Sequence, residues 1–168
     1  DDDEYRQSEK FAAHARYWSE KYQTVPDALI SRRYGHDDMR LDMTAFWIPC
    51  AQYERLTALA KDCEASTFHA LLALFALYFL RVTGRDDLVV GLPVLNRSSK
   101  RFKETVGLFV SVSPAKFELG QALTFAEVMA QINATLRRDY RAQRFPLSAL
   151  NRAVGLLHTG RTHLFDLE

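Results

Sequence analysis

Two stretches decide the fold of this chain: Asp86-Asp87-Leu88-Val89-Val90-Gly91-Leu92-Pro93-Val94-Leu95-Asn96-Arg97 and Val106-Gly107-Leu108-Phe109-Val110-Ser111-Val112-Ser113-Pro114. The unbroken apolar run 88–94 is typical of a strand covered on both faces, and residues 108–112 predict the next strand. Each stretch carries a glycine, Gly91 or Gly107, where we expect the backbone to pass close to a neighbour. The chain therefore contains two predicted strands joined by a loop.

The connecting loop is basic, with Arg97, Lys100, Arg101 and Lys103. Two interpretations stay open: a solvated surface turn, or a contact for a phosphate or an acidic partner protein. Over the whole chain, 22 Lys and Arg balance 21 Asp and Glu, which leaves a net charge of +1. A charge this small produces no global field toward nucleic acid or a membrane surface, so we expect neither as a partner.

Helical patterns surround the two strands. Ser8 opens a pattern with apolar residues on one face, and the good N-cap residues Ser66 and Thr67 open an apolar helix that ends at Gly84. That helix is apolar around most of its circumference, which favours a central position. The other predicted elements are a strand over 41–47, a helix after Pro49, a helix opened by the capping box at 124–127, a short helix after 145–146 and the start of a strand at 163–168.

These mixed strands and helices predict an α/β fold with a mixed sheet. Hydrophobic residues make up 48% and charged residues 26%, the balance of a soluble globular protein. The longest apolar run, 70–80, is too short to span a bilayer. Cys50 and Cys63 fit neither a metal spacing nor a disulfide framework, so we expect two reduced, half-buried thiols in a cytoplasmic protein.

Common catalytic motifs are absent from the sequence. It has no G-x-S-x-G, no phosphate-binding G-x-x-x-x-G-K-S/T, no G-x-G-x-x-G and no H-E-x-x-H. None of the histidines begins an H-x-x-x-D pattern, and we expect none to be catalytic. His14 is predicted on the solvent side of its helix, His36 in a polar turn, and His69 as a hydrogen-bonded core or boundary residue.

The order of the motifs resembles the condensation domains of nonribosomal peptide synthetases, within the chloramphenicol-acetyltransferase-like superfamily. The two strand stretches are similar to the family's D-hydrophobic-hydrophobic-x-G-x-P-x-x-N-R and I/V-G-x-F-V-N-T. Three further resemblances, to the family's Tyr-Trp helix, its T-x-F-x-x-L-L-A start and its H-x-D-x-P-F-E-x-L motif, fall on Ala15-Arg16-Tyr17-Trp18, on residues 66–73 and on residues 141–150. Residues 161–165 resemble R-x-P-L-F.

Several positions depart from these patterns. Ser111 and Val112 stand where the family usually has Asn and Thr, and His163 stands in place of a proline. In the H-x-D-x-P-F-E-x-L motif, Arg141 replaces the histidine and the acid is lost. The substitution at Ser111 keeps one donor and one acceptor but loses reach, which puts its role in orienting a substrate in doubt.

The resemblance implies a two-layer, chloramphenicol-acetyltransferase-like sandwich, present here in part. Whole domains of this family have two lobes around a tunnel, and carrier proteins deliver phosphopantetheine-tethered thioesters to its two ends. A histidine of an upstream H-H-x-x-x-D-G motif assists peptide-bond formation; that motif does not occur in this chain. We expect residues 1–39 to be the tail of the first lobe and its connection, and residues 40–168 to be the second lobe, truncated at its end.

The same resemblance implies the chain's partners. They are the missing first lobe, donor and acceptor carrier-protein domains, and an adjacent adenylation domain. We expect no directly bound cofactor and no metal, because the phosphopantetheine arms belong to the carrier proteins.

The predicted site has no catalytic residue of its own. In the second strand, Phe109, Ser111 and Ser113 share one face, which suits a tunnel wall, while an alternative is that both serines satisfy neighbouring backbone. Arg97 is predicted to form an ion pair near the lobe junction or to be a surface charge. The candidate tunnel or support residues are Gly91, Pro93, Asn96, Arg97, Gly107, Phe109, Ser111 and Ser113.

Two alternatives to the synthetase interpretation stay open. The first is a stand-alone acyltransferase of the same superfamily that moves an acyl group to an alcohol or amine. The second is a non-catalytic, condensation-like module that recruits a tailoring enzyme. Carrier and adenylation domains beside this chain would favour the synthetase over the stand-alone enzyme, and their absence would favour the stand-alone enzyme. The residue at the second histidine position of the upstream motif distinguishes a catalytic domain from the recruiting module.

Overall fold

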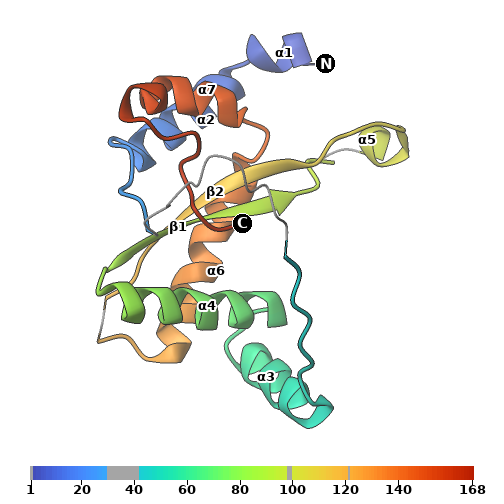
Figure 1. The fold of residues 1–168 in the computed structure, drawn as a ribbon. Helices are drawn as coiled ribbons and strands as arrows, with labels where there is room; N and C mark the ends of the chain where they lie inside the picture. Colours follow the sequence, from blue (N-terminus) through green and yellow to red (C-terminus); the bar gives the residue numbers. More distant parts are fainter. Residues whose placement is uncertain (1, 30–41, 98–99, 121) are drawn as a thin grey trace. The chain divides into compact units, whose positions relative to one another are not determined.

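A computed structural model of the chain describes residues 2–29, 42–97, 100–120 and 122–168, without the side chain of residue 101 (Figure 1). The chain divides into two compact units. The first consists of Asp1–Leu29, Asp87–Glu118 and Ala134–Glu168, and the second of Ile30–Asp86 and Leu119–Asn133. In chain order the elements are α1 (Asp2–Arg6), α2 (Glu9–Lys21), α3 (Cys50–Asp62), α4 (Thr67–Thr83), β1 (Asp87–Val94), α5 (Lys100–Glu104), β2 (Ser111–Glu118), α6 (Phe125–Arg141), α7 (Leu147–Ala153) and the 3₁₀ helix η1 (Leu156–Thr159).

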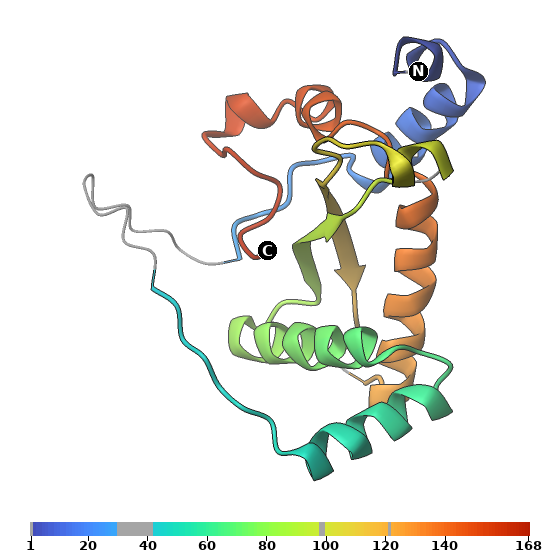
Figure 2. The ribbon, with the colours of Figure 1, turned by 90° about the vertical axis from the view of Figure 1, so that its right-hand side faces the viewer.

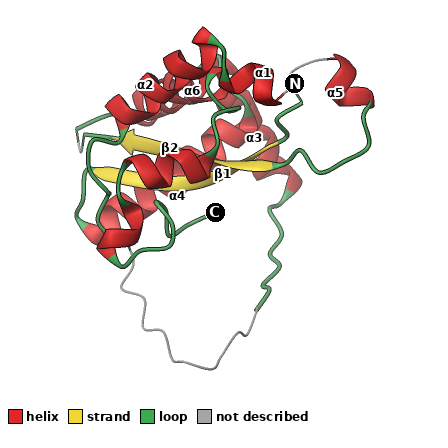
Figure 3. Cartoon of the chain, turned by 90° about the horizontal axis from the view of Figure 1, so that it is seen from above, coloured by secondary structure: helices red, strands yellow, loops and turns green. Residues whose placement is uncertain are grey.

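In the first unit, β1 and β2 form an antiparallel pair (Figure 3). Five consecutive residues of β1, from Leu88 to Leu92, are buried, which confirms a strand covered on both faces. Val90 also forms a parallel bridge with Leu167, and the Gly91 N–H donates to the Leu167 carbonyl at 2.7 Å. This parallel bridge agrees with the predicted mixed pairing, but residues 163–168 form no strand, and the predicted start of a strand there is present only as this bridge.

The predicted start of the second strand is wrong. We expected it at Leu108, but β2 begins at Ser111, the residue that pairs with the last residue of β1. Beyond β1, Asn96 has a φ of 50°, a left-handed conformation that takes the chain out of the ladder. Leu108 and Val110 consequently have no described strand opposite them and are 92% and 52% exposed. Apolar residues alternate over 108–110 as they do in a strand, which is why the sequence predicted one there. A strand also needs a neighbour that accepts its hydrogen bonds, and no described segment lies in that position.

Aromatic residues of α2 and of its C-cap position anchor the core of the first unit. Ser8 caps this helix by accepting from the Phe11 N–H at 3.2 Å, as the sequence predicted. The indole of Trp18 donates to the Ala142 carbonyl and the hydroxyl of Tyr22 to the Pro114 carbonyl, both at 3.1 Å. These two side chains belong to a buried cluster with Val89, Ala142, Leu150, Leu156, Leu164 and Phe165.

In the second unit, α3 packs against α4, and a short turn joins the two helices (Figure 2). Ser66 caps α4 in a capping box with His69, and Gly84 ends the helix at a φ of 67°; both ends are as predicted. The side-chain amide of Asn133, in α6, donates to the Glu64 carbonyl of the α3–α4 turn at 3.3 Å. This hydrogen bond ties the amino-terminal part of α6 to that turn.

Two predictions for the second unit are wrong. Residues 42–49 form no strand, because no described segment pairs with them; Trp47 is 93% exposed. Helix α4 is not buried all round either. One face, with Ala70, Ala73 and Ala76, is fully buried, while a stripe at helical spacing remains exposed. That stripe consists of Phe68, Leu71, Phe75, Tyr78 and Val82.

The last two predicted helices are confirmed. At the start of α6, the Thr124 N–H and hydroxyl both donate to Glu127 Oε2 at 2.7 Å, and the Glu127 N–H donates to Thr124 Oγ1 at 3.3 Å. This is the predicted capping box. Pro146 is the N-cap of α7, which suits a residue that has no N–H to leave unpaired.

Candidate functional site

The candidate tunnel residues gather where β1 ends and β2 begins. Because the strands are antiparallel, Gly91 pairs with Pro114, Leu92 with Ser113, Pro93 with Val112 and Val94 with Ser111. Of the predicted site residues, Gly91, Pro93, Ser111 and Ser113 are therefore brought together on adjoining strand ends. Asn96 and Arg97 follow β1, and Gly107 and Phe109 precede β2.

Two serines define one face of β2, since residues i and i+2 of a strand point the same way. Ser113 is 5% exposed, and its buried Oγ atom has no hydrogen-bond partner among the residues the structure describes. Ser111 is half-buried. A buried hydroxyl without a partner costs about 1–3 kcal/mol, so it marks a polar position that the fold alone does not satisfy. The alternative that Ser113 satisfies neighbouring backbone does not hold for this side chain.

Arg97 fixes the loop between the strands. Its guanidinium donates to the backbone carbonyls of Phe102, Thr105 (2.8 Å) and Gly107 (3.0 Å), and it lies 4.2 Å from the centre of the Phe109 ring. These contacts are with carbonyls and a ring, and the predicted ion pair of Arg97 near the lobe junction stays a prediction. The guanidinium of Arg97 is planar and has several N–H donors, so it can bind several carbonyls of one turn and lie against an aromatic ring at the same time.

The two glycines have different roles. A Cβ atom on Gly91 would lie 2.5 Å from the Phe165 ring, which confirms the predicted close approach. At Gly107 the nearest atom would be 3.5 Å away, an ordinary contact, so close approach is the wrong explanation there. The backbone of Gly107 instead has a φ of 156°, which residues with side chains rarely adopt.

A buried charged cluster lies in the first unit, and the sequence analysis did not find it. Asp139 is 1% exposed; Lys21 Nζ lies 2.6 Å from its Oδ1 atom, and the Tyr17 hydroxyl donates to the same oxygen at 2.5 Å. Burial raises the pKa of Tyr17 and the neighbouring carboxylate raises it further. Burial lowers the pKa of Lys21, against the opposing effect of Asp139. The sequence did contain an indication of this burial. Asp139 follows Leu136 by three residues and therefore lies on the apolar face of α6.

The predictions for the histidines and cysteines are wrong at two residues, His14 and Cys50. His14 is buried, not on the solvent side, because the short helix α1 covers it and places the Tyr5 hydroxyl 2.7 Å from its Nδ1 atom. His69 is hydrogen-bonded at a helix start, as expected. His36 lies outside the described residues. Cys63 is half-buried as predicted, whereas Cys50, on the first turn of α3, is exposed.

The burial of His14 predicts a pH dependence of stability. Burial, helped by the positive charge of Lys10, lowers the pKa of His14 below its usual value, so the folded chain favours the neutral imidazole. The stabilisation is complete above the ordinary histidine pKa of about 6.5 and is lost as the pH falls through the lower, folded value. We expect the melting temperature to decrease from pH 7.5 to pH 5, with a smaller decrease in His14→Gln. Parallel pH profiles for the two proteins would contradict this assignment.

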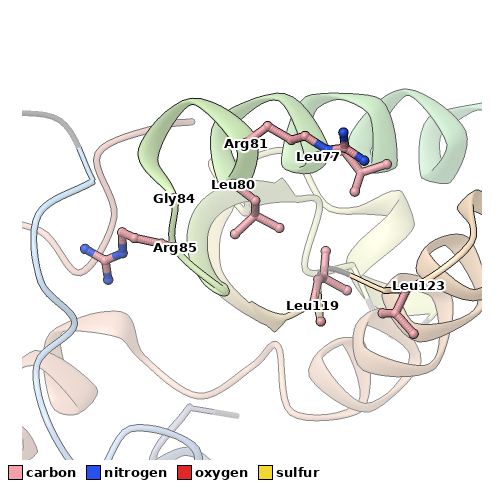
Figure 4. A pocket seen from close by; sticks show the side chains of 8 residues that line it. Leu77, Leu80, Arg81, Gly84, Arg85, Leu119 and Leu123 are labelled. Carbon is pink, nitrogen blue, oxygen red and sulfur yellow. The ribbon is translucent and has the colours of Figure 1, made fainter.

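A cavity of about 330 Å³ lies in the second unit, at the end of α4. Leu80, Leu119 and Leu123 form its apolar floor (Figure 4). The Arg81 side chain extends along the helix toward Leu77, and the Arg85 guanidinium points away from the leucines. The lining therefore provides apolar contact without polar groups converging on one point, and none of the predicted tunnel residues belongs to it.

Two properties of the described residues bear on metals and membranes. No three His, Cys, Asp or Glu side chains among them form a group that could hold a metal ion. No single described helix is long and apolar enough to cross a membrane; α3 and α4 meet the length and composition only as a pair, which is bent by 98°.

Comparison with known proteins gives the class of this fold. Surfactin synthase subunit 1 of Bacillus subtilis is 25% identical over 166 residues, which cover 98% of this chain and 5% of that protein. A dimodular nonribosomal peptide synthase of the same organism is 24% identical over 165 residues, or 97% of this chain and 7% of that protein. The first condensation domain of the calcium-dependent antibiotic synthetase superposes with a TM-score of 0.82 at 22% identity, over 91% of this chain and 34% of that structure.

The fold is thus that of a condensation domain, of which this chain has about a third of the length of the solved example. The sequence pattern of the condensation domain family matches residues 1–168, and the chain belongs to that family. The family resemblance and the partial chloramphenicol-acetyltransferase-like fold predicted from the sequence are confirmed.

Proposed function

We propose that this chain forms one wall of the substrate tunnel in a nonribosomal peptide synthetase condensation domain, which joins carrier-tethered acyl or aminoacyl thioesters through an amide bond. The observation that carries the proposal is the family match over residues 1–168, with its two strand motifs side by side at the ends of β1 and β2. The chain itself has no H-H-x-x-x-D-G motif, so the histidine that assists the reaction belongs to another part of the domain.

The partners follow from the same proposal. Donor and acceptor carrier proteins bring the phosphopantetheine arms, an adenylation domain lies beside the condensation domain, and the whole assembly is cytoplasmic. Residues 1–39 are the tail of the first lobe and residues 40–168 are part of the second. The exposed apolar stripe of α4, defined above, supports a larger domain, because such surfaces are usually covered by other protein.

Ser113 provides the test of the tunnel wall. In this chain its buried hydroxyl has no described partner, so Ser113→Ala should leave the melting temperature unchanged or raise it. In the domain that contains the chain, the same substitution should slow peptide-bond formation about fivefold to tenfold, the effect of one lost hydrogen bond to a bound substrate. The measurement is product formation from two loaded carrier proteins.

Ser148, which is exposed on α7, provides a matched control. Ser148→Ala should change neither the melting temperature nor the rate. If Ser113→Ala lowers the melting temperature and leaves the rate unchanged, the hydroxyl supports the fold and the tunnel-wall proposal is wrong.

A further inference from the structure

Arg144 lies close to two aromatic rings of the first compact unit, one from α1 and one from α5. Its guanidinium carbon is 4.3 Å from the centre of the Tyr5 ring, in α1, and 5.6 Å from the centre of the Phe102 ring, in α5. The same guanidinium lies 3.3 Å from Asp2 Oδ1. Both rings are within the distance at which a cation is attracted to an aromatic face.

The Tyr5 side of this arrangement is firmly held. Tyr5 is 6% exposed, meets Phe11 edge to face at 5.4 Å, and is hydrogen-bonded to His14. Phe11 in turn lies 5.1 Å from Phe145, the residue after Arg144. Helices α1 and α2 and the residue that follows Arg144 therefore pack against one another through these rings.

The Phe102 side leads to the loop between the strands. The rings of Phe102 and Phe109 are 5.3 Å apart, and Arg97 lies 4.2 Å from the centre of the Phe109 ring while donating to carbonyls of the same loop. A continuous series of contacts thus runs from Tyr5 through Arg144, Phe102 and Phe109 to Arg97. We call it the arginine–aromatic stack.

The segment 100–110 buries little apolar surface. Val106 is fully exposed, Leu108 is 92% exposed and Val110 is 52% exposed, so the apolar burial of this segment is confined to the half-buried rings of Phe102 and Phe109. The contacts described between this segment and the rest of the unit include those of Arg97 and Arg144 with its rings and carbonyls. A segment with few buried apolar contacts opens easily, and its conformation then depends on the few contacts it keeps.

We propose that Arg144 is a positioning residue that holds segment 100–110 against the amino-terminal helices α1 and α2. This segment immediately precedes β2. Through Phe102 and Phe109 it holds the segment that precedes the strand carrying Ser111 and Ser113. The consequence for catalysis rests on the proposed function, because only then is β2 a tunnel wall.

Hydrogen exchange of the full chain tests the coupling without any enzymatic activity. Arg144→Gln removes the cation, and we expect amides of 100–110 to exchange about three- to thirtyfold faster, the range expected for loss of one or two cation–aromatic contacts. Amides of β1 that bond to β2 should exchange as before. Arg144→Lys keeps the charge and should restore part of the protection.

Two further variants make the result specific. Arg141→Gln is the matched control, because Arg141 is exposed and its side chain donates to the Arg137 carbonyl of its own helix at 3.2 Å. It should leave exchange in 100–110 unchanged. Tyr5→Leu should speed that exchange as Arg144→Gln does, and the double variant should add little to either alone, since both break the same contact.

Unchanged exchange of 100–110 in both Arg144→Gln and Tyr5→Leu would overturn the proposal. A separate arm measures peptide-bond formation in the domain that contains this chain. Faster exchange together with a reduced rate supports both the coupling and the tunnel wall. Faster exchange with an unchanged rate leaves the coupling in place and shows that the proposed function assigns the wrong role to β2.

Discussion

Replacing Gly91 with alanine is expected to destabilise this chain more than any other single-methyl addition we consider. A Cβ atom at Gly91 would lie 2.5, 2.7 and 2.8 Å from three ring atoms of Phe165. Phe165 is 6% exposed within the core cluster, so its ring has little room to withdraw. Overpacking of this kind costs typically about 1–3 kcal/mol. Denaturant unfolding of the two proteins measures the difference.

Gly120→Ala is the matched control for this prediction. Its nearest neighbour, in Leu123, would lie 4.0 Å from the added Cβ, so we expect a change below about 0.5 kcal/mol. Adding Phe165→Leu to Gly91→Ala should recover part of the loss, because the smaller side chain gives back space. Equal stabilities of Gly91→Ala and the unsubstituted chain would show that the ring does not pack on this glycine.

Asp139→Ala is expected to produce the other large loss of stability. It removes the carboxylate that pairs with Lys21, whose side chain is 14% exposed, and that accepts from Tyr17. Removing one partner of a buried ion pair costs about 3–5 kcal/mol, because the remaining charge is left without compensation. The free energy of unfolding near neutral pH is the quantity to measure.

An exposed ion pair in the same unit provides the comparison. Lys100 and Glu104 lie 3.9 Å apart with side chains that are 91% and 68% exposed. Water screens such a pair, so Glu104→Ala should cost less than about 1 kcal/mol. Similar losses in Asp139→Ala and Glu104→Ala would mean that the Asp139 cluster contributes no more than a surface pair.

Local chemistry made the helices predictable from the sequence. Ser8, Ser66 and Thr124 each cap a helix through atoms within a few residues, and all three helix starts agree with prediction. The strands depend on neighbours that the sequence does not reveal. Residues 42–49 and 108–110 alternate as strands do, but no described segment pairs with them. Pairing, not alternation, decided where β2 begins.

The candidate site divides in the same way. The motif residues of β1 and β2 were identified from the sequence, and the structure brings their strand ends together. The Lys21–Asp139 contact joins residues 118 positions apart, and no local rule predicts such a pair. Arg144 lay within a recognised motif stretch but was not singled out from the sequence. Its contacts with Tyr5 and Phe102 depend on the tertiary structure.

The central claim is that this chain is the non-catalytic part of a condensation domain. The most direct test is peptide-bond formation between two loaded carrier proteins, measured with this chain alone and with the contiguous full domain. We predict no product from the chain alone, product from the full domain, and loss of that product when the second histidine of the upstream H-H-x-x-x-D-G motif is replaced by alanine. Product from the isolated chain would contradict the claim, and a full domain that binds carriers without forming product would point to a recruiting module instead.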